Sequence, residues 1–196
     1  MTAAFGKYKI YPVMYMETTV IRPWRPEDAP ALAEALNNRK VLANLRDGLP
    51  FPYTERDALG YISAMLAAEP GEVSAFAIDC GGRAAGSISV TRCGNIHRRT
   101  AEIGYYLGEA YWGRGLATRA VSEACEYVFS NSDILRIFAE PFERNAASRR
   151  VLEKSGFTLE GILRANAIKD GQVLNMCMYS RLSPELEGGY GAGQGR

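Results

Sequence analysis

The segment AYWGRGLAT, residues 110–118, places two glycines and an arginine between a strand pattern and a helix pattern. The strand is expected to end near Gly108 and the helix to begin near Gly115, where apolar residues start to recur at three- and four-residue steps. The first turn of a helix has unpaired N–H groups and a partial positive charge, and glycines let an anion approach these donors without meeting a Cβ atom. We therefore expect a pyrophosphate cradle whose ligands are the Arg114 guanidinium, the Thr118 hydroxyl and the backbone of Gly113, Gly115, Leu116, Ala117 and Thr118. The alternative is that the two glycines only permit a sharp turn.

The segments around this turn alternate between strand and helix patterns. In chain order they predict a strand at 18–24, helices at 31–38 and from Thr54 to 69, strands at 73–79, 84–90 and 99–108, a helix from 116 to 128, a strand at 134–141, a helix at 145–156 and paired strands at 157–168 and 172–182. Asp170 and Gly171 are typical of a tight hairpin turn between the last two strands. The order β α α β β β α β α β β predicts an α/β fold with a mixed sheet that has a parallel part in its middle.

Length and composition fit one ordinary globular domain of 196 residues. We expect a folded domain at 17–183, an N-terminal extension at 1–16 and a flexible glycine-rich tail at 184–196. A net charge of +1 argues against nucleic acid as a partner. No apolar run has the length of a membrane span, and the N-terminus lacks the apolar core of a signal peptide, so a cytoplasmic location without membrane binding is expected. No heptad or large apolar stripe indicates an oligomeric state.

Four widely spaced cysteines, Cys80, Cys93, Cys125 and Cys177, form no CxxC pair. This spacing suggests neither a zinc site nor a disulfide framework. We interpret them as buried or half-buried free thiols, and we expect no metal.

Two motifs together resemble the general N-acetyltransferase (GNAT) superfamily, and within it the RimJ/RimL-like ribosomal-protein-alanine N-acetyltransferases. The superfamily signature Q/R-x-x-G-x-G/A is matched at Trp112, Gly115 and Ala117, with Trp112 in place of the usual polar residue. Residues 145–157, NAASRRVLEKSGF, look like the second motif N-x-x-S-x-x-V-L-x-K-x-G-F. The resemblance implies a central, mostly antiparallel mixed sheet with splayed parallel strands 4 and 5, about four flanking helices and acetyl-CoA as cosubstrate.

The same resemblance implies where the cofactor lies. Its pantetheine arm would run along the end of the fourth strand at Tyr106, Leu107 and Gly108, as an added strand does at a sheet edge. Asn145 is either the cap of the following helix or a hydrogen-bond partner of the arm, or both. Strand alternation sends Tyr105 and Tyr106 to opposite faces, so we expect only one of them to meet the ligand.

Two residues are candidates for the chemistry. Many superfamily members have a tyrosine proton donor seven places after the asparagine, where this chain has Leu152, whereas Ser148 matches the RimJ/RimL-like serine. We expect Ser148 to donate to the leaving thiolate; the alternative is a polar residue in a first helical turn. Glu102 is the candidate base, directly or through water, and its alternative is an ion pair with Arg98 or Arg99.

The expected reaction is direct acetyl transfer to a primary amine, and the resemblance favours a protein N-terminus as acceptor. An α-amine has a pKa of about 7.7–8.0, whereas that of lysine is about 10.4, so an α-amine needs little help from a base. A small amine such as a polyamine, amino acid or antibiotic is the alternative acceptor, and a non-catalytic acyl-CoA sensor is the alternative function. In the family the region of Arg25, Arg39, Arg46 and Arg56 covers the acceptor groove, to which Phe51 and Tyr53 are candidates for an apolar wall.

Overall fold

The computed structural model describes residues 20–69 and 71–187. The predicted N-terminal extension, the first residues of the predicted domain and the end of the predicted tail lie outside these ranges. The elements in chain order are β1 (Ile21–Arg22), η1 (Pro26–Asp28), α1 (Ala29–Leu36), α2 (Arg39–Leu42), α3 (Glu55–Leu66), β2 (Val73–Cys80), β3 (Arg83–Arg92), η2 (Asn95–His97), β4 (Thr100–Leu107), η3 (Glu109–Tyr111), α4 (Leu116–Asn131), β5 (Arg136–Ala139), α5 (Ala146–Lys154), β6 (Thr158–Lys169), β7 (Gln172–Leu182) and α6 (Pro184–Glu187).

This order confirms the predicted succession of strands and helices, and it adds three 3-10 helices, η1, η2 and η3, and two short α-helices. The unexpected α2 begins at Arg39 and is capped by Asn38, whose side chain accepts a hydrogen bond from the Lys40 N–H at 2.8 Å. The other addition, α6, takes up the first four residues of the predicted tail. The predicted hairpin turn is present, with positive φ at both Asp170 (50°) and Gly171 (75°).

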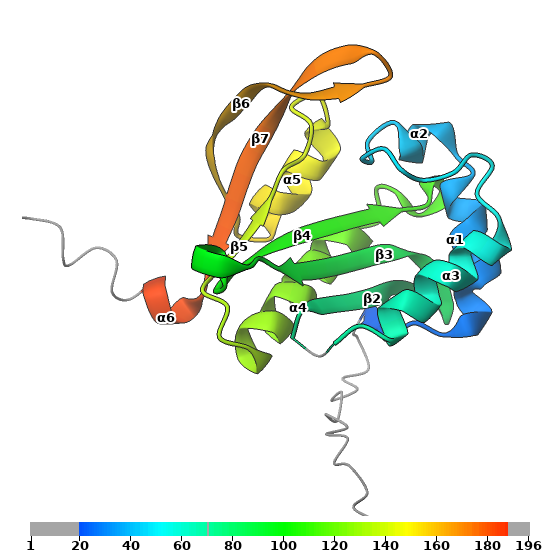
Figure 1. Cartoon of the computed structure of the whole chain (residues 1–196), viewed down its shortest axis with the longest axis horizontal. Coiled ribbons are helices and arrows are strands. Elements are labelled where there is room, and N and C mark those ends of the chain that lie inside the picture. The colour runs from blue at the N-terminus through cyan, green and yellow to red at the C-terminus, as the bar shows by residue number, and fades with distance from the viewer. Residues whose placement is uncertain (1–19, 70, 188–196) are drawn as a thin grey trace, which may run out of the picture.

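The seven strands form one sheet in the order β1-β2-β3-β4-β5-β7-β6. Every neighbouring pair is antiparallel except β4 and β5, which are parallel, so the predicted mixed sheet is confirmed. Ala101 and Glu102 of β4 pair with both β3 and β5, and Thr100 before them pairs with β5. We call residues 100–102 the sealed half of β4. Residues 103–107 pair with β3 only, and we call them the open half. Beyond the sealed half β4 and β5 diverge, and the β6–β7 hairpin rises away from the rest of the sheet (Figure 1).

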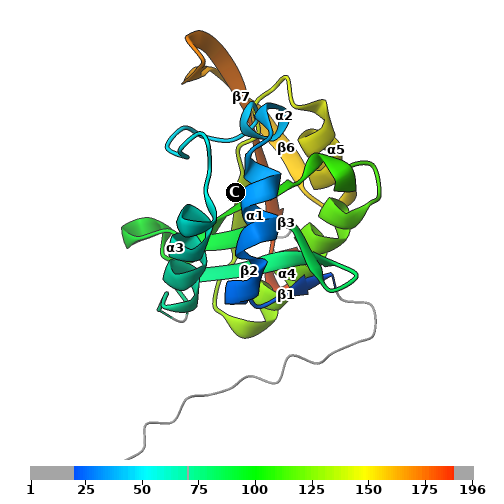
Figure 2. The same ribbon diagram turned by 90° about the vertical axis from the view of Figure 1, so that its right-hand side faces the viewer.

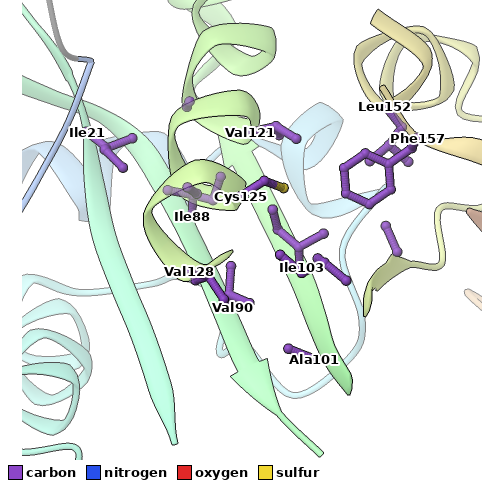
Figure 3. Packing of buried hydrophobic residues seen from close by; sticks show 14 of the residues in the cluster. Ile21, Ile88, Val90, Ala101, Ile103, Val121, Cys125, Val128, Leu152 and Phe157 are labelled. Atoms are coloured by element: carbon purple, nitrogen blue, oxygen red, sulfur yellow. The ribbon is translucent and has the colours of Figure 1, made fainter. Parts of the chain in front are cut away.

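Helices cover both faces of the sheet. α1 and α3 pack together on one face and α4 lies against the other (Figures 1 and 2). On the α4 face, Val121, Cys125 and Val128 point at strand residues such as Ile88 and Ile103 (Figure 3). Four α-helices of the described ranges, α1, α3, α4 and α5, have eight residues or more, in line with the expected number. The longest, α4, has 16 residues, and none of the described helices is long and apolar enough to cross a bilayer.

The two central strands come unusually close at Gly86 of β3, which lies opposite Leu107. A Cβ atom built on Gly86 would be 2.1 Å from the Tyr106 carbonyl oxygen and 2.9 Å from the Leu107 Cα. No side chain fits in that space, so glycine is needed here for close backbone approach rather than for its φ angle.

All four cysteines are free thiols, as predicted. Cys125 and Cys177 are buried, whereas Cys80 and Cys93 are half-buried. Burial raises the pKa of Cys125 to about 12, which keeps this thiol protonated and unreactive at neutral pH.

Candidate functional site

A cavity of about 930 Å³ lies where β4 and β5 diverge. Its walls come from the end of β4, the starts of α4 and α5, and the connection between α2 and α3. Eleven predicted site residues line it together: Glu102, Tyr106, Leu107, Gly113, Arg114, Gly115, Leu116, Ala117, Thr118, Asn145 and Ser148. The exception is Gly108, whose N–H donates to the Ala85 carbonyl at 2.9 Å and so belongs to the β3 side of the strand.

The glycine turn between β4 and α4 has the backbone that an anion cradle needs. Gly113 and Gly115 have φ angles of 73° and 76°, in the left-handed region that residues with a Cβ atom rarely adopt. The Arg119 N–H is bonded to the Gly115 carbonyl at 3.2 Å. The N–H groups ahead of it are the unpaired donors of a helix start, and they lie at the positive end of a 16-residue helix.

Arg114, between the two glycines, is exposed, and its guanidinium carbon lies 6.0 Å from the centre of the Tyr111 ring. It therefore adds a cation beside the cradle without being committed to a buried ion pair. This arrangement of donors and charge fits a phosphate or pyrophosphate group.

Backbone direction decides which groups of the open half face the cavity. The Tyr106 carbonyl lies close against Gly86, on the β3 side, as does the Gly108 N–H. Backbone groups alternate along a strand, so those of Tyr105 and Leu107 point the other way, into the gap between β4 and β5. An extended ligand pairing with this edge would therefore meet Tyr105 and Leu107 rather than Tyr106 and Gly108.

Trp112 takes part in this edge. Its indole Nε1 donates to the Leu107 carbonyl at 2.8 Å, and 44% of the residue is exposed. The residue that replaces the usual polar one in the motif thus still supplies an N–H donor at the end of β4.

The start of α5 carries Ser148 and Asn145 into the cavity wall. The Asn145 Oδ1 accepts from the Ser148 N–H at 3.1 Å, which confirms Asn145 as the helix cap. The Ser148 Oγ lies 2.9 Å from the Tyr105 hydroxyl, and that hydroxyl also lies 3.1 Å from the Ser148 carbonyl oxygen, to which it donates. Leu152, at the position of the family's tyrosine, is fully buried in the core.

The two tyrosines of β4 point to opposite faces, as predicted. Tyr105 packs toward α4 and α5, whereas Tyr106 packs toward α1 and α3. Burial raises the pKa of both phenols, that of Tyr106 well above its usual value. Both residues line the cavity, because it surrounds the free end of the strand, and the expectation that only one of them meets the ligand stays a prediction. Tyr105 is a site residue that sequence reasoning passed over; the alternation that sends it to the α5 face was the available signal.

Glu102 is held by an arginine, but by Arg46 instead of Arg98 or Arg99. Arg46, from the α2–α3 connection, forms an ion pair with Glu102 and lies 3.5 Å from the Glu140 Oε2 at the end of β5. Arg99 instead bonds to Asp133. Two carboxylates and one exposed guanidinium therefore meet at the mouth of the cavity.

The predicted apolar wall is made of other residues. Tyr53 is buried in the core beneath α1 and α3, and Phe51 is half exposed, with the Arg39 guanidinium 4.5 Å above its ring. The α2–α3 connection instead turns Leu45 and Leu49 to the cavity. Of the four arginines expected near an acceptor groove, Arg46 lines the cavity.

Comparison with known proteins gives three kinds of match. Residues 19–158 match the family model described as an acetyltransferase (GNAT) domain. A putative ribosomal N-acetyltransferase of Bacillus subtilis (strain 168) is 32% identical over 107 residues, which are 55% of this chain and 58% of that protein. The spermidine N(1)-acetyltransferase of Escherichia coli (strain K12) is 31% identical over 107 residues, 53% of this chain and 57% of that protein.

Among solved structures, Mycobacterium smegmatis RimJ in complex with CoA-disulfide superposes with a TM-score of 0.76 at 25% identity, covering 85% of this chain and 82% of that one. The chain spans about half the length of the curated relatives it matches. The family model, however, covers well over half of this chain. The chain therefore belongs to the GNAT family of acetyltransferases.

Proposed function

We propose that the protein is an acetyl-CoA-dependent N-acetyltransferase of the RimJ/RimL-like group, acting on a primary amine. The observation that carries this proposal is that one cavity joins the glycine turn at the start of α4, the open half of β4 and Ser148. These three features match the three parts of the cofactor: an anionic pyrophosphate, an amide-bearing arm and a thioester.

The residues present fit that cofactor. The unpaired N–H groups at the start of α4 and the Arg114 side chain would hold the pyrophosphate. The backbone of Tyr105 and Leu107 would pair with the amides of the arm. When bound, acetyl-CoA supplies the activated acyl group, and the N–H donors of the open edge would stabilise charge on its carbonyl oxygen.

Transfer directly to the amine is favoured over an acyl-enzyme. Ser148, the serine at the α5 start, has a phenol rather than a base as its hydroxyl partner. No cysteine is among the residues that line the cavity. A covalent route needs a nucleophile activated by an adjacent base, which these described residues do not provide.

We propose a protein α-amine as acceptor, with Glu102 taking its proton directly or through water. Glu102 lines the cavity at the boundary between the sealed and open halves of β4. An α-amine is partly neutral at physiological pH, so it needs little help from a base. The similarity to a putative ribosomal N-acetyltransferase supports this acceptor class.

A polyamine is the second candidate acceptor. Glu102 and Glu140 together form an acidic mouth that would attract a multiply charged amine once Arg46 moves aside. The similarity to a spermidine acetyltransferase supports it.

The test is acetyl-CoA turnover, followed by free thiol release, on matched acceptors. Peptides with a free N-terminal alanine or serine are compared with the same peptides acetylated at the N-terminus, and both with spermidine. The proposal expects turnover on the free peptides and none on the blocked ones. Turnover on spermidine alone would favour the second candidate, and acetyl-CoA binding without turnover on any acceptor would contradict the enzyme and favour the sensor.

A further inference from the structure

We propose that Tyr105 is a positioning residue that aims the Ser148 hydroxyl proton at the leaving sulfur. This inference rests on the proposed function, since it assigns a role within the same reaction. Tyr105 would act through Ser148 and need not touch the cofactor with its hydroxyl.

The geometry allows two arrangements of hydrogen atoms on the same heavy atoms. In one, the Tyr105 hydroxyl donates to the Ser148 carbonyl at 3.1 Å and accepts from the Ser148 Oγ at 2.9 Å. In the other, Tyr105 donates to the Ser148 Oγ, and the serine proton is free to turn into the cavity. Rotation of two hydroxyl hydrogens interconverts them, so no backbone or side-chain movement is required.

Burial makes Tyr105 a permanent donor in this pair. Its ring packs against the core beneath α4, and desolvation raises the pKa of the phenol, an effect that the bond to Ser148 only partly offsets. The phenol therefore stays protonated across the working pH range, and both acceptors within reach of its proton, the carbonyl oxygen and the Oγ, belong to Ser148. A charge that develops on sulfur favours the arrangement in which the Ser148 proton points to it.

The chemical step balances without any proton leaving Tyr105. The lone pair of the neutral amine forms a bond to the carbonyl carbon of the acetyl group, the nitrogen gives up one proton to Glu102 or water, and the carbon–sulfur bond breaks with its electron pair on sulfur. Ser148 stabilises that negative charge by donating its hydroxyl proton in a hydrogen bond to the sulfur. The Ser148 Oγ no longer donates to Tyr105, and the Tyr105 hydroxyl donates to the Ser148 Oγ instead. In this chain the tyrosine that takes part therefore comes from β4, because the family's tyrosine position on α5 is the buried Leu152.

The test compares Tyr105→Phe, Ser148→Ala and the double variant with the control Tyr127→Phe. Tyr127 lies on α4, packs edge-on against Phe76 at 5.2 Å and is not among the residues lining the cavity. We expect Tyr105→Phe to lower kcat about tenfold, because it weakens the hydrogen bond that Ser148 donates to the negatively charged sulfur. KM for acetyl-CoA and Tm should change little. Ser148→Ala should lower kcat at least as much, and the double variant should match Ser148→Ala alone, because the two residues act as a unit.

Two results would overturn the inference. If the wild type turns over and Tyr105→Phe stays within twofold of it, or if the two losses multiply in the double variant, Tyr105 does not act through Ser148. A wild type that binds acetyl-CoA but acetylates no acceptor would overturn the proposed function as well. The wild-type assay therefore separates the two failures.

Discussion

The sealed and open halves of β4 belong to one strand, yet they do different things. In the sealed half, β3 and β5 take up the backbone groups on both sides, and Ala101 packs with Ile137 in the core. In the open half, β3 takes up one side only, and the other side faces a cavity. The strand is therefore held rigidly at one end and left with free hydrogen-bonding groups at the other. A fold that ends a strand pairing early creates a peptide-like binding edge without needing any loop to build it.

The largest expected effect comes from weakening the sealed half. Ile137→Ala removes a fully buried side chain of β5, and it should lower the free energy of unfolding by about 2–5 kcal/mol. The control is Ile168→Ala on β6, where 70% of the residue is exposed and the change should be within about 0.5 kcal/mol.

Chemical denaturation measures both variants, and acetyl-CoA should still raise the Tm of each. An Ile137→Ala variant that keeps its stability but no longer shows a rise in Tm with acetyl-CoA would mean that the sealed and open halves of β4 do not have separate functions.

The next effect concerns the turn that follows the open half. Gly115→Val places a β-branched residue at φ 76°, which is strained by about 1–3 kcal/mol, so the turn should rearrange and the cradle be lost. We expect acetyl-CoA affinity to fall at least about tenfold, equivalent to about 1.4 kcal/mol, by calorimetry.

Gly171→Val is the matched control, because Gly171 has φ 75° and an added Cβ meets nothing within 4 Å at either position. Both variants should lose similar stability, and only Gly115→Val should lose the cofactor. Equal acetyl-CoA affinity in the two would refute the cradle.

The smallest effect tests the edge itself. Trp112→Phe removes the indole N–H that occupies the Leu107 carbonyl, so a ligand amide would no longer compete for that acceptor. We expect acetyl-CoA affinity to rise by about 2–10-fold, the size of one net hydrogen bond.

Trp24→Phe is the control for this variant, since Trp24 is buried in the α1–α3 core and its Nε1 has no partner among the described residues. Its effect should appear in stability and leave affinity unchanged. A fall in affinity for Trp112→Phe would mean that the indole supports the cofactor instead of competing with it.

Local features were predictable from the sequence because neighbouring residues determine them. The caps at Thr54 and Asn145, the hairpin turn at Asp170 and the glycine turn before α4 each need only a few adjacent residues. The succession of such elements also gave the mixed sheet, because it alternates hairpins with strand–helix–strand units.

Contacts across the fold were not predictable in the same way. The Tyr105–Ser148 and Arg46–Glu102 pairs join residues 43 and 56 positions apart, so they depend on how β4 meets α5 and how the α2–α3 connection runs. The same connection decides that Leu49, and neither Phe51 nor Tyr53, lines the cavity. An apolar residue in a loop has no periodicity that would reveal which way it points.

The bare backbone at Gly86 has a consequence for genetics. Gly86 does not line the cavity, yet a side chain there would push against the Tyr106 carbonyl and displace the strand end that carries Leu107. A substitution at this position should therefore behave in a screen like an allele of the cofactor site, although the mutated residue is not part of its wall.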